Sequence, residues 1–125
     1  MNFPAELKYT KDHEWVLFDG DVAVVGISDF AQNALGDLVF VNLPEVGDEV
    51  KAGEAFGDVE SVKAVSDINS PVNGTVCAVN EVAADSAQSL NTDPYGTWLI
   101  KVENFTEADD LMDAEAYKAF CESEA

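Results

Sequence analysis

The fold is decided by residues 56–74, which read FGDVESVKAVSDINSPVNG. Apolar residues alternate with polar and acidic ones on both sides of Lys63, a pattern typical of half-buried β-strands. Turn-forming residues punctuate the chain at 47–53 and again at 71–74, so that Lys63 falls midway between them. This spacing predicts a rough two-fold repeat of strands, with Lys63 at the tip of a tight hairpin between the two halves.

The rest of the chain is divided into similarly short strands. Asp19-Gly20 is a strong hairpin signal within residues 14–27, and the strand expected at DLVFVNLP ends at Pro44. A closing strand is expected at TWLIKVE, residues 97–103. Short strands separated by turns predict an all-β sandwich or flattened barrel rather than a βαβ fold. The large apolar side chains expected in its core are Phe40, Phe56 and Trp98.

Two helical regions are expected beside the strands. The segment from Ser28 to Gly36 predicts a short helix, with Ser28 as its N-cap and Gly36 ending it at positive φ. The C-terminal segment, about 103–125, predicts helical turns that open at the capping box 106–109 and resume after Asp113. This segment has too little apolar material for a core of its own, so residues 1–125 are expected to form one domain with the segment packed on it.

Charge is the most unusual bulk property of the chain. The 125 residues include 25 acidic residues, six lysines and no arginine, which gives a formal net charge of −19. Nucleic acids and anionic membrane surfaces would be repelled, so neither is expected as a partner. The charge favours solubility, and it would steer the chain toward proteins with basic docking patches. No apolar run is long enough to cross a bilayer.

The residue sets of common enzymes are missing. His13 is the only histidine, and Cys77 and Cys121 form no CxxC pair, so neither a metal site nor a redox centre is expected. No G-x-S-x-G, Walker or Rossmann pattern occurs. The N-terminus resembles neither a signal nor a transit peptide, which favours the cytoplasm, although a mature mitochondrial protein would look similar.

The run V-E-S-V-K-A-V-S-D-I around Lys63 is similar to that of the H proteins of the glycine cleavage system. Biotin carriers are usually built around E-A-M-K-M, and lipoyl domains of 2-oxo-acid dehydrogenases more often show D-K-A. Further segments resemble H proteins in the right order, from about Leu7 to Phe120: KYTKDHEWV, GDVAVVGISDFAQNALGDLVFVNLPEVGDEV, SPVNGTV, NTDPYG, WLIKV and LMDAEAYKAF. This ordered set is far more specific than the lysine run alone.

The resemblance implies a lipoyl/biotinyl-type barrel-sandwich hybrid that acts as a carrier and is not itself an enzyme. Lys63 would hold lipoate as an amide, attached by a lipoate ligase or lipoyl transferase. The carrier would shuttle the aminomethyl group of glycine from a pyridoxal-phosphate glycine decarboxylase to a tetrahydrofolate-dependent aminomethyltransferase. Dihydrolipoamide dehydrogenase would reoxidise the arm. A monomer is expected, because the carrier must dock on several enzymes in turn.

The resemblance also implies a cleft that shelters the loaded arm, lined by Glu14 and Asp67. The chain departs from familiar H proteins at Asp12, where serine is common, and at Phe30, where histidine is common. A usual proline is missing near Ala87, and YGTWL lacks a second glycine. Because of these departures, the resemblance does not predict the geometry of the loops around residues 85–97.

Other functions remain compatible with the same residues. A lipoyl carrier that relays lipoate to other enzymes would need the same Lys63. A protein-binding module whose Lys63 is never modified would need only an exposed surface, and its intact mass would lack a lipoyl group. A biotin carrier is opposed by Val62 and Ala64 in place of methionines. A hydrolase has no residue set to support it.

Overall fold

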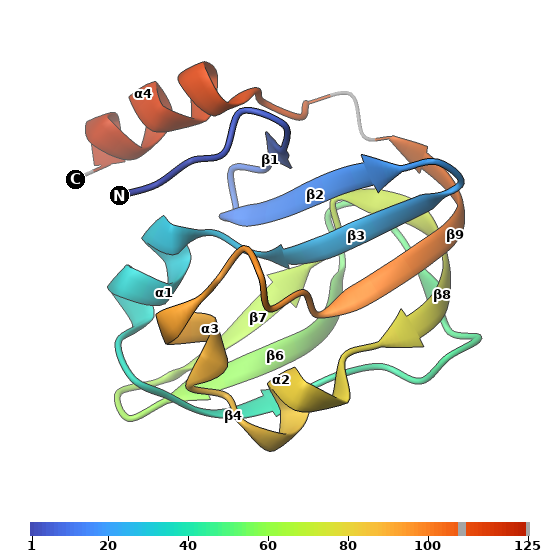
Figure 1. Ribbon diagram of the computed structural model, residues 1–125, viewed down its shortest axis with the longest axis horizontal. Coiled ribbons are helices and arrows are strands. Elements are labelled where there is room, and N and C mark those ends of the chain that lie inside the picture. The colour runs from blue at the N-terminus through green and yellow to red at the C-terminus, as the bar shows by residue number, and fades with distance from the viewer. Residues whose placement is uncertain (108–109, 125) are drawn as a thin grey trace.

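The computed structural model describes residues 1–107 and 110–124, and these form two antiparallel sheets (Figure 1). The larger sheet has the order β1-β2-β3-β9-β8-β5, with bounds Lys8–Tyr9 (β1), Glu14–Asp19 (β2), Val22–Ile27 (β3), Ile100–Glu107 (β9), Val72–Val79 (β8) and Glu49–Val50 (β5). The smaller sheet has the order β4-β6-β7, with bounds Leu38–Asn42, Ala55–Ser61 and Val65–Asn69. The expected β-rich sandwich is confirmed.

Local turn and cap signals account for the first part of the fold. β2 and β3 pair from Glu14↔Ile27 to Asp19↔Val22, and Gly20 at the turn has a φ of 59°. Helix α1 (Asp29–Leu35) begins where the Ser28 hydroxyl accepts a hydrogen bond from the Ala31 amide, and it ends at Gly36, whose φ is 81°. Both features were predicted from the sequence.

Of the three further helices, α2 (Glu81–Asp85) and α3 (Ser89–Thr92) differ from the expectation. Both lie in a region read as strand and loop. The Asn80 side chain caps α2 by accepting from the Val82 amide, a signal that the sequence did contain. Helix α4 (Ala114–Glu124) confirms the C-terminal helix.

The start of the C-terminal segment was predicted wrongly. Residues 103–107 are the end of strand β9 and not helix, because they pair with β8 as far as Val72↔Glu107. The capping box expected at 106–109 therefore begins inside a strand, and its last two residues lie outside the described residues. Asp113 caps α4 as expected, accepting from the Ala116 amide at 2.8 Å.

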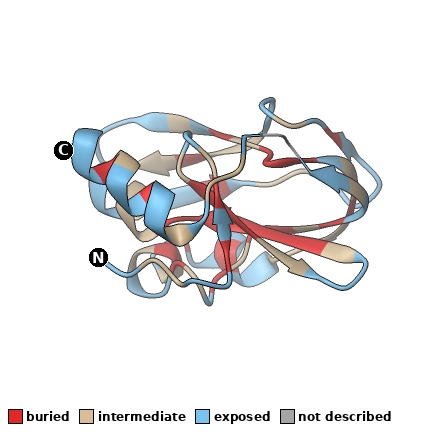
Figure 2. Ribbon diagram, turned by 90° about the horizontal axis from the view of Figure 1, so that it is seen from above, coloured by how far each residue is buried: buried red, intermediate tan, exposed pale blue. Residues whose placement is uncertain are grey.

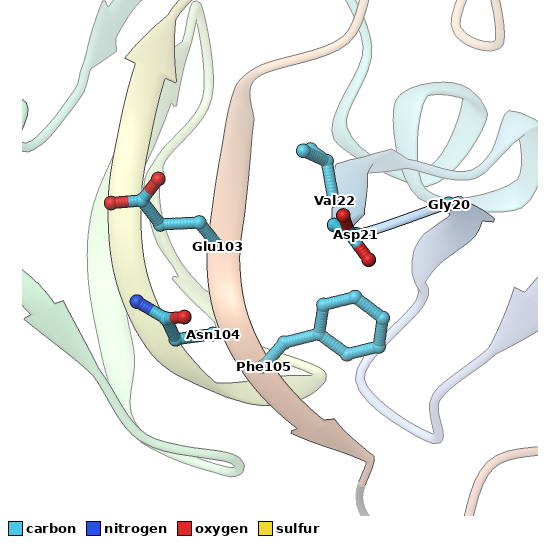
Figure 3. A pocket seen from close by; sticks show the side chains of 6 residues that line it. All are labelled: Gly20, Asp21, Val22, Glu103, Asn104 and Phe105. Carbon is cyan, nitrogen blue, oxygen red and sulfur yellow. The ribbon is translucent and has the colours of Figure 1, made fainter.

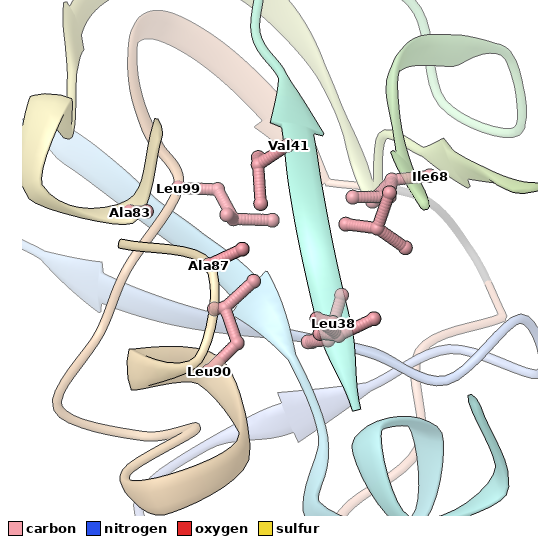
Figure 4. Close-up of a cluster of buried hydrophobic side chains, with 9 residues drawn as sticks. Leu38, Val41, Ile68, Ala83, Ala87, Leu90 and Leu99 are labelled. Atoms are coloured by element: carbon pink, nitrogen blue, oxygen red, sulfur yellow. The ribbon is translucent and has the colours of Figure 1, made fainter. Parts of the chain in front are cut away.

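The main core lies between the sheets, where Figure 2 shows most of the buried residues. One cluster joins the inner face of the smaller sheet to helices α2 and α3 (Figure 4), and its buried members are Ile27, Leu38, Val41, Val59, Ile68, Ala83, Ala87, Leu90 and Leu99. Phe56 and Trp98 are partly buried against such clusters. Phe40 is not core, since 60% of it is exposed.

The exposure of Phe40 has a local cause. The β4–β6 register shifts between Leu38 and Phe40, which is a β-bulge. A bulge disturbs the simple alternation of side chains, so that Leu38 and Val41 are both buried while Phe40 is left outside.

Helix α4 covers β1 and the start of β2. The rings of Tyr9 and Tyr117 stack with centroids 4.5 Å apart, and the Tyr117 hydroxyl lies 2.6 Å from Ser28 Oγ and 2.8 Å from His13 Nδ1. The His13 ring also stacks on that of Phe30. Phe30, where familiar H proteins often have histidine, is therefore part of the packing beneath α4. Within the described ranges, no helix has the length and apolar character needed to span a bilayer.

Candidate functional site

Lys63 lies in a three-residue turn between β6 and β7, as the sequence predicted. The Ser61 amide donates to the Ala64 carbonyl at 2.8 Å, which closes the turn. The Ser61 hydroxyl oxygen accepts from the amides of Lys63 and Ala64, each at 3.1 Å. Ser61 therefore fixes the backbone on both sides of the lysine, and the Lys63 side chain is left exposed.

The turn rests on the connection between α1 and β4. The Val62 amide donates to the Asp37 carbonyl at 3.2 Å. A Cβ added at Gly36 would lie 3.7 Å from both Cε and Nζ of Lys63, so the lysine side chain lies over this glycine. The carbonyl end of α1 carries partial negative charge, which favours a nearby ammonium group.

Asn91 braces the same connection from the other side. Its carboxamide oxygen accepts from the Leu38 amide at 2.9 Å, and its nitrogen donates to the Gly36 carbonyl at 2.9 Å and to Gln32 Oε1 at 3.1 Å. Nothing in the sequence around Asn91 singles it out, because the turn-forming residues of NTDPYG predict only a loop there. The structure makes it a positioning residue for the segment on which the lysine turn rests.

Asn91→Ala should loosen the support of the lysine turn. The substitution leaves the Leu38 amide and the Gly36 carbonyl without partners, which costs about 1–3 kcal/mol of unfolding free energy. Urea denaturation would measure this loss, and amide hydrogen exchange should become faster at Leu38 and Val62. The matched control is Asn73→Ala, which removes two exposed hydrogen bonds, to Ala52 and Thr106, neither of which belongs to the lysine turn. Unchanged exchange at Val62 would contradict the bracing role.

The Lys63 amine is open to a modifying enzyme. Among residues 1–107 and 110–124, the ion pair found is His13–Glu124, with 2.9 Å between Nε2 and Oε2, and Lys63 takes no part in it. Asp67 is therefore not an ion-pair partner of the unmodified lysine. An exposed amine on a fixed turn suits covalent attachment of a prosthetic arm.

Glu14 is placed very differently, since only 2% of it is exposed. Its Oε1 accepts from the Thr10 hydroxyl at 2.7 Å, and its Oε2 accepts from the Asn69 amide at 3.4 Å. Burial raises the pKa of Glu14, the Thr10 hydrogen bond lowers it and the nearby Asp12 charge adds to the rise, and the net result is a pKa of about 7. The carboxyl can therefore gain or lose a proton near neutral pH.

Strand β7 connects the three residues singled out in the sequence. It begins just after Lys63, carries the exposed Asp67, and ends at Asn69, whose amide donates to Glu14. β7 is an edge strand of the smaller sheet, so Glu14 covers part of its open edge. Asp67 pairs across to Asp58 on β6.

Asp12 adds negative charge beside Glu14. Its carboxylate accepts from the Asn69 carboxamide at 3.1 Å. A small hollow of about 160 Å³ lies here, with Thr10, Asp12 and Ser70 among its lining residues. Glu14 and Asp67 do not line this hollow.

A larger hollow, of about 430 Å³, lies at the turn between β2 and β3, where Gly20, Asp21 and Val22 face Glu103, Asn104 and Phe105 of β9 (Figure 3). Figure 1 places this turn at the opposite end of the molecule from the β6–β7 turn. It is therefore separate from the lysine site.

The fold and the site together define a class of protein. A two-sheet β-sandwich that presents an exposed lysine on a hairpin turn has the architecture of carrier domains of the lipoyl/biotinyl type.

Comparison with known proteins gives the particular family. The family described as "Glycine cleavage H-protein" matches residues 7–124. The chain is 52% identical to a glycine cleavage system H protein of Acidobacterium capsulatum over 99% of this chain and 98% of the relative. It is 56% identical to one from Burkholderia cenocepacia over 93% and 94%. A solved glycine cleavage system H protein from Mycobacterium marinum superposes with a TM-score of 0.88 at 45% identity, covering 94% and 97%. The chain belongs to the glycine cleavage H-protein family.

Proposed function

We propose that the chain is the lipoyl carrier of a glycine cleavage system, with lipoate held as an amide on Lys63. The observation that carries this proposal is the Lys63 amine itself, exposed on a turn whose backbone is fixed by Ser61 and by Asp37. We further propose that residues 1–125 act as one lipoyl-carrier domain. Membership of the family supports both statements.

The protein contributes position, and the prosthetic group contributes chemistry. Bound lipoate supplies a disulfide that can be reduced and a sulfur that can carry a one-carbon group. The chain holds the root of the arm on a rigid turn, and the small side chain of Ala64 leaves the approach to the amine clear. We propose that this carrier is not itself catalytic.

The proposed partners are those of glycine cleavage, which family membership supports in general terms. Glycine decarboxylase would load the carrier, aminomethyltransferase would unload it, and dihydrolipoamide dehydrogenase would reoxidise it. A lipoate ligase or lipoyl transferase would attach the arm. The relatives named above are bacterial, and we place the protein in the bacterial cytoplasm.

Glu14 and Asp67 are proposed to stabilise the cationic end of the loaded arm. A cation that approaches the buried Glu14 carboxyl would favour its ionised form and would be held by it. This role predicts faster hydrolysis of the loaded carrier when Glu14 is replaced by Gln. An unchanged hydrolysis rate would remove the protective role but would leave the carrier function intact.

Intact mass of the protein from its native host tests the central proposal. A lipoyl increment on the peptide that contains Lys63 is expected. An unmodified lysine in cells that express the glycine cleavage enzymes would overturn the proposal and would favour a plain protein-binding module. A lipoylated protein that never accepts the aminomethyl group from purified glycine decarboxylase would belong to the lipoate-relay class instead.

A further inference from the structure

The outer face of the smaller sheet exposes an unusual amount of apolar surface around the lysine turn. Seven large apolar residues are strongly exposed in the described ranges, and four of them belong to β4, to the turn or to the start of β7. We call these four residues the tip face: Val39 (48% exposed), Phe40 (60%), Val62 (68%) and Val65 (62%). Such a concentration marks an interaction surface better than scattered exposed residues do.

The strand register places two of these residues, Phe40 and Val65, in one row across the sheet. Phe40 lies opposite Glu60, and Glu60 lies opposite Val65, so these three side chains share a face. Val62 and Lys63 follow directly at the turn. An enzyme that binds the root of an arm on Lys63 would contact this row.

Acidic residues accompany the apolar row. Glu60 stands within it, and the neighbouring row across the same face consists of Asn42, Asp58 and Asp67. Asn42 donates to Asp58 at 2.6 Å, and none of the three carboxylates forms an ion pair in the described part of the chain. Amide formation on Lys63 would remove the one cation of the turn, so the modified face would be apolar and anionic.

We propose that the tip face is the docking surface for glycine decarboxylase, through an apolar pocket rimmed by lysine or arginine. This inference rests on the function proposed above. The decarboxylase binds the carboxylate of glycine and the phosphate of its cofactor, and an active-site mouth that attracts both anions would be electropositive. An acidic, apolar surface at the root of the arm complements such a mouth, with Phe40 as the aromatic anchor.

Binding of the chain to purified glycine decarboxylase, measured in the absence of the lipoyl arm, tests the docking surface. The unlipoylated chain is titrated against the enzyme, so the readout is a dissociation constant rather than turnover. Phe40→Ala should raise Kd at least tenfold, which is about 1.4 kcal/mol, and Val65→Ala about threefold. The matched control is Val46→Ala in the connection between β4 and β5, since Val46 is 62% exposed like Val65. This control should bind like the wild type.

The dependence of binding on charge is an independent test of the same docking surface. Added salt should weaken wild-type binding, and Glu60→Lys should weaken binding and reduce its salt dependence. Thermal melts verify that each variant is folded, which is expected because the side chains of the tip face are exposed. Equal Kd values for Phe40→Ala, Val65→Ala and Val46→Ala would overturn the docking surface, as would a wild-type chain that does not bind.

The outcomes separate this proposal from the carrier function. A chain that is lipoylated and supports decarboxylation, but whose tip-face variants bind normally, refutes the docking surface alone. A chain that is never lipoylated refutes the carrier function. Sedimentation of the free chain should show a monomer. A wild-type dimer that Phe40→Ala dissociates would assign the tip face to a second copy and overturn the proposal.

Discussion

Lys63→Arg should abolish both lipoylation and glycine-dependent activity of the reconstituted system. The guanidinium keeps the positive charge and most of the side-chain length, but it stays protonated at any physiological pH and offers no amine nitrogen for an amide bond. Intact mass should show no lipoyl increment after incubation with a lipoate-attaching enzyme. Release of carbon dioxide from glycine should fall to background.

Lys118→Arg is the matched control for this loss. Lys118 is also exposed, but it lies on α4 rather than on the β6–β7 turn. Its variant should be lipoylated on Lys63 and should retain wild-type activity. Activity that survives in Lys63→Arg would show that the arm is attached elsewhere or is not needed.

Glu14→Gln should change how the stability of the protein depends on pH. Burial raises the pKa of Glu14 to about 7 from 4.5, so the native state binds this proton more tightly than the unfolded chain. As pH rises, the unfolded carboxyl ionises first and unfolding becomes easier. The stabilising contribution is complete below pH 4.5 and is lost as pH rises through 7, for a total of roughly 3 kcal/mol.

Urea denaturation at several pH values measures this effect. The free energy of unfolding of the wild type minus that of Glu14→Gln should fall by roughly 3 kcal/mol from pH 4 to pH 8. Glutamine has the shape of the protonated acid and cannot ionise, so it isolates the contribution of this one group. Glu49→Gln, at an exposed position on β5, controls for the removal of a negative charge. A pH-independent difference at position 14 would contradict the titration of a buried carboxyl.

Local patterns predicted much of the fold and the position of Lys63 on a turn between two strands. Asp19-Gly20 predicted the β2–β3 hairpin, and Ser28 with Gly36 predicted α1, because turns and caps depend on residues close together in the chain. The alternation around Lys63 placed the lysine on a turn between two strands for the same reason. Helices α2 and α3 were missed because five and four residues are too few to show a helical period.

Local sequence patterns are enough to place one lysine on a β-hairpin turn of a short-stranded, strongly acidic chain. The surroundings of that lysine depend on long-range packing: the bulge that exposes Phe40, the burial of Glu14 against β7, the brace made by Asn91 and the extension of β9 to Glu107. Each of these joins segments that are distant in the chain or depends on a register shift. Alternation along a strand specifies two faces, but packing against distant segments decides which face is buried.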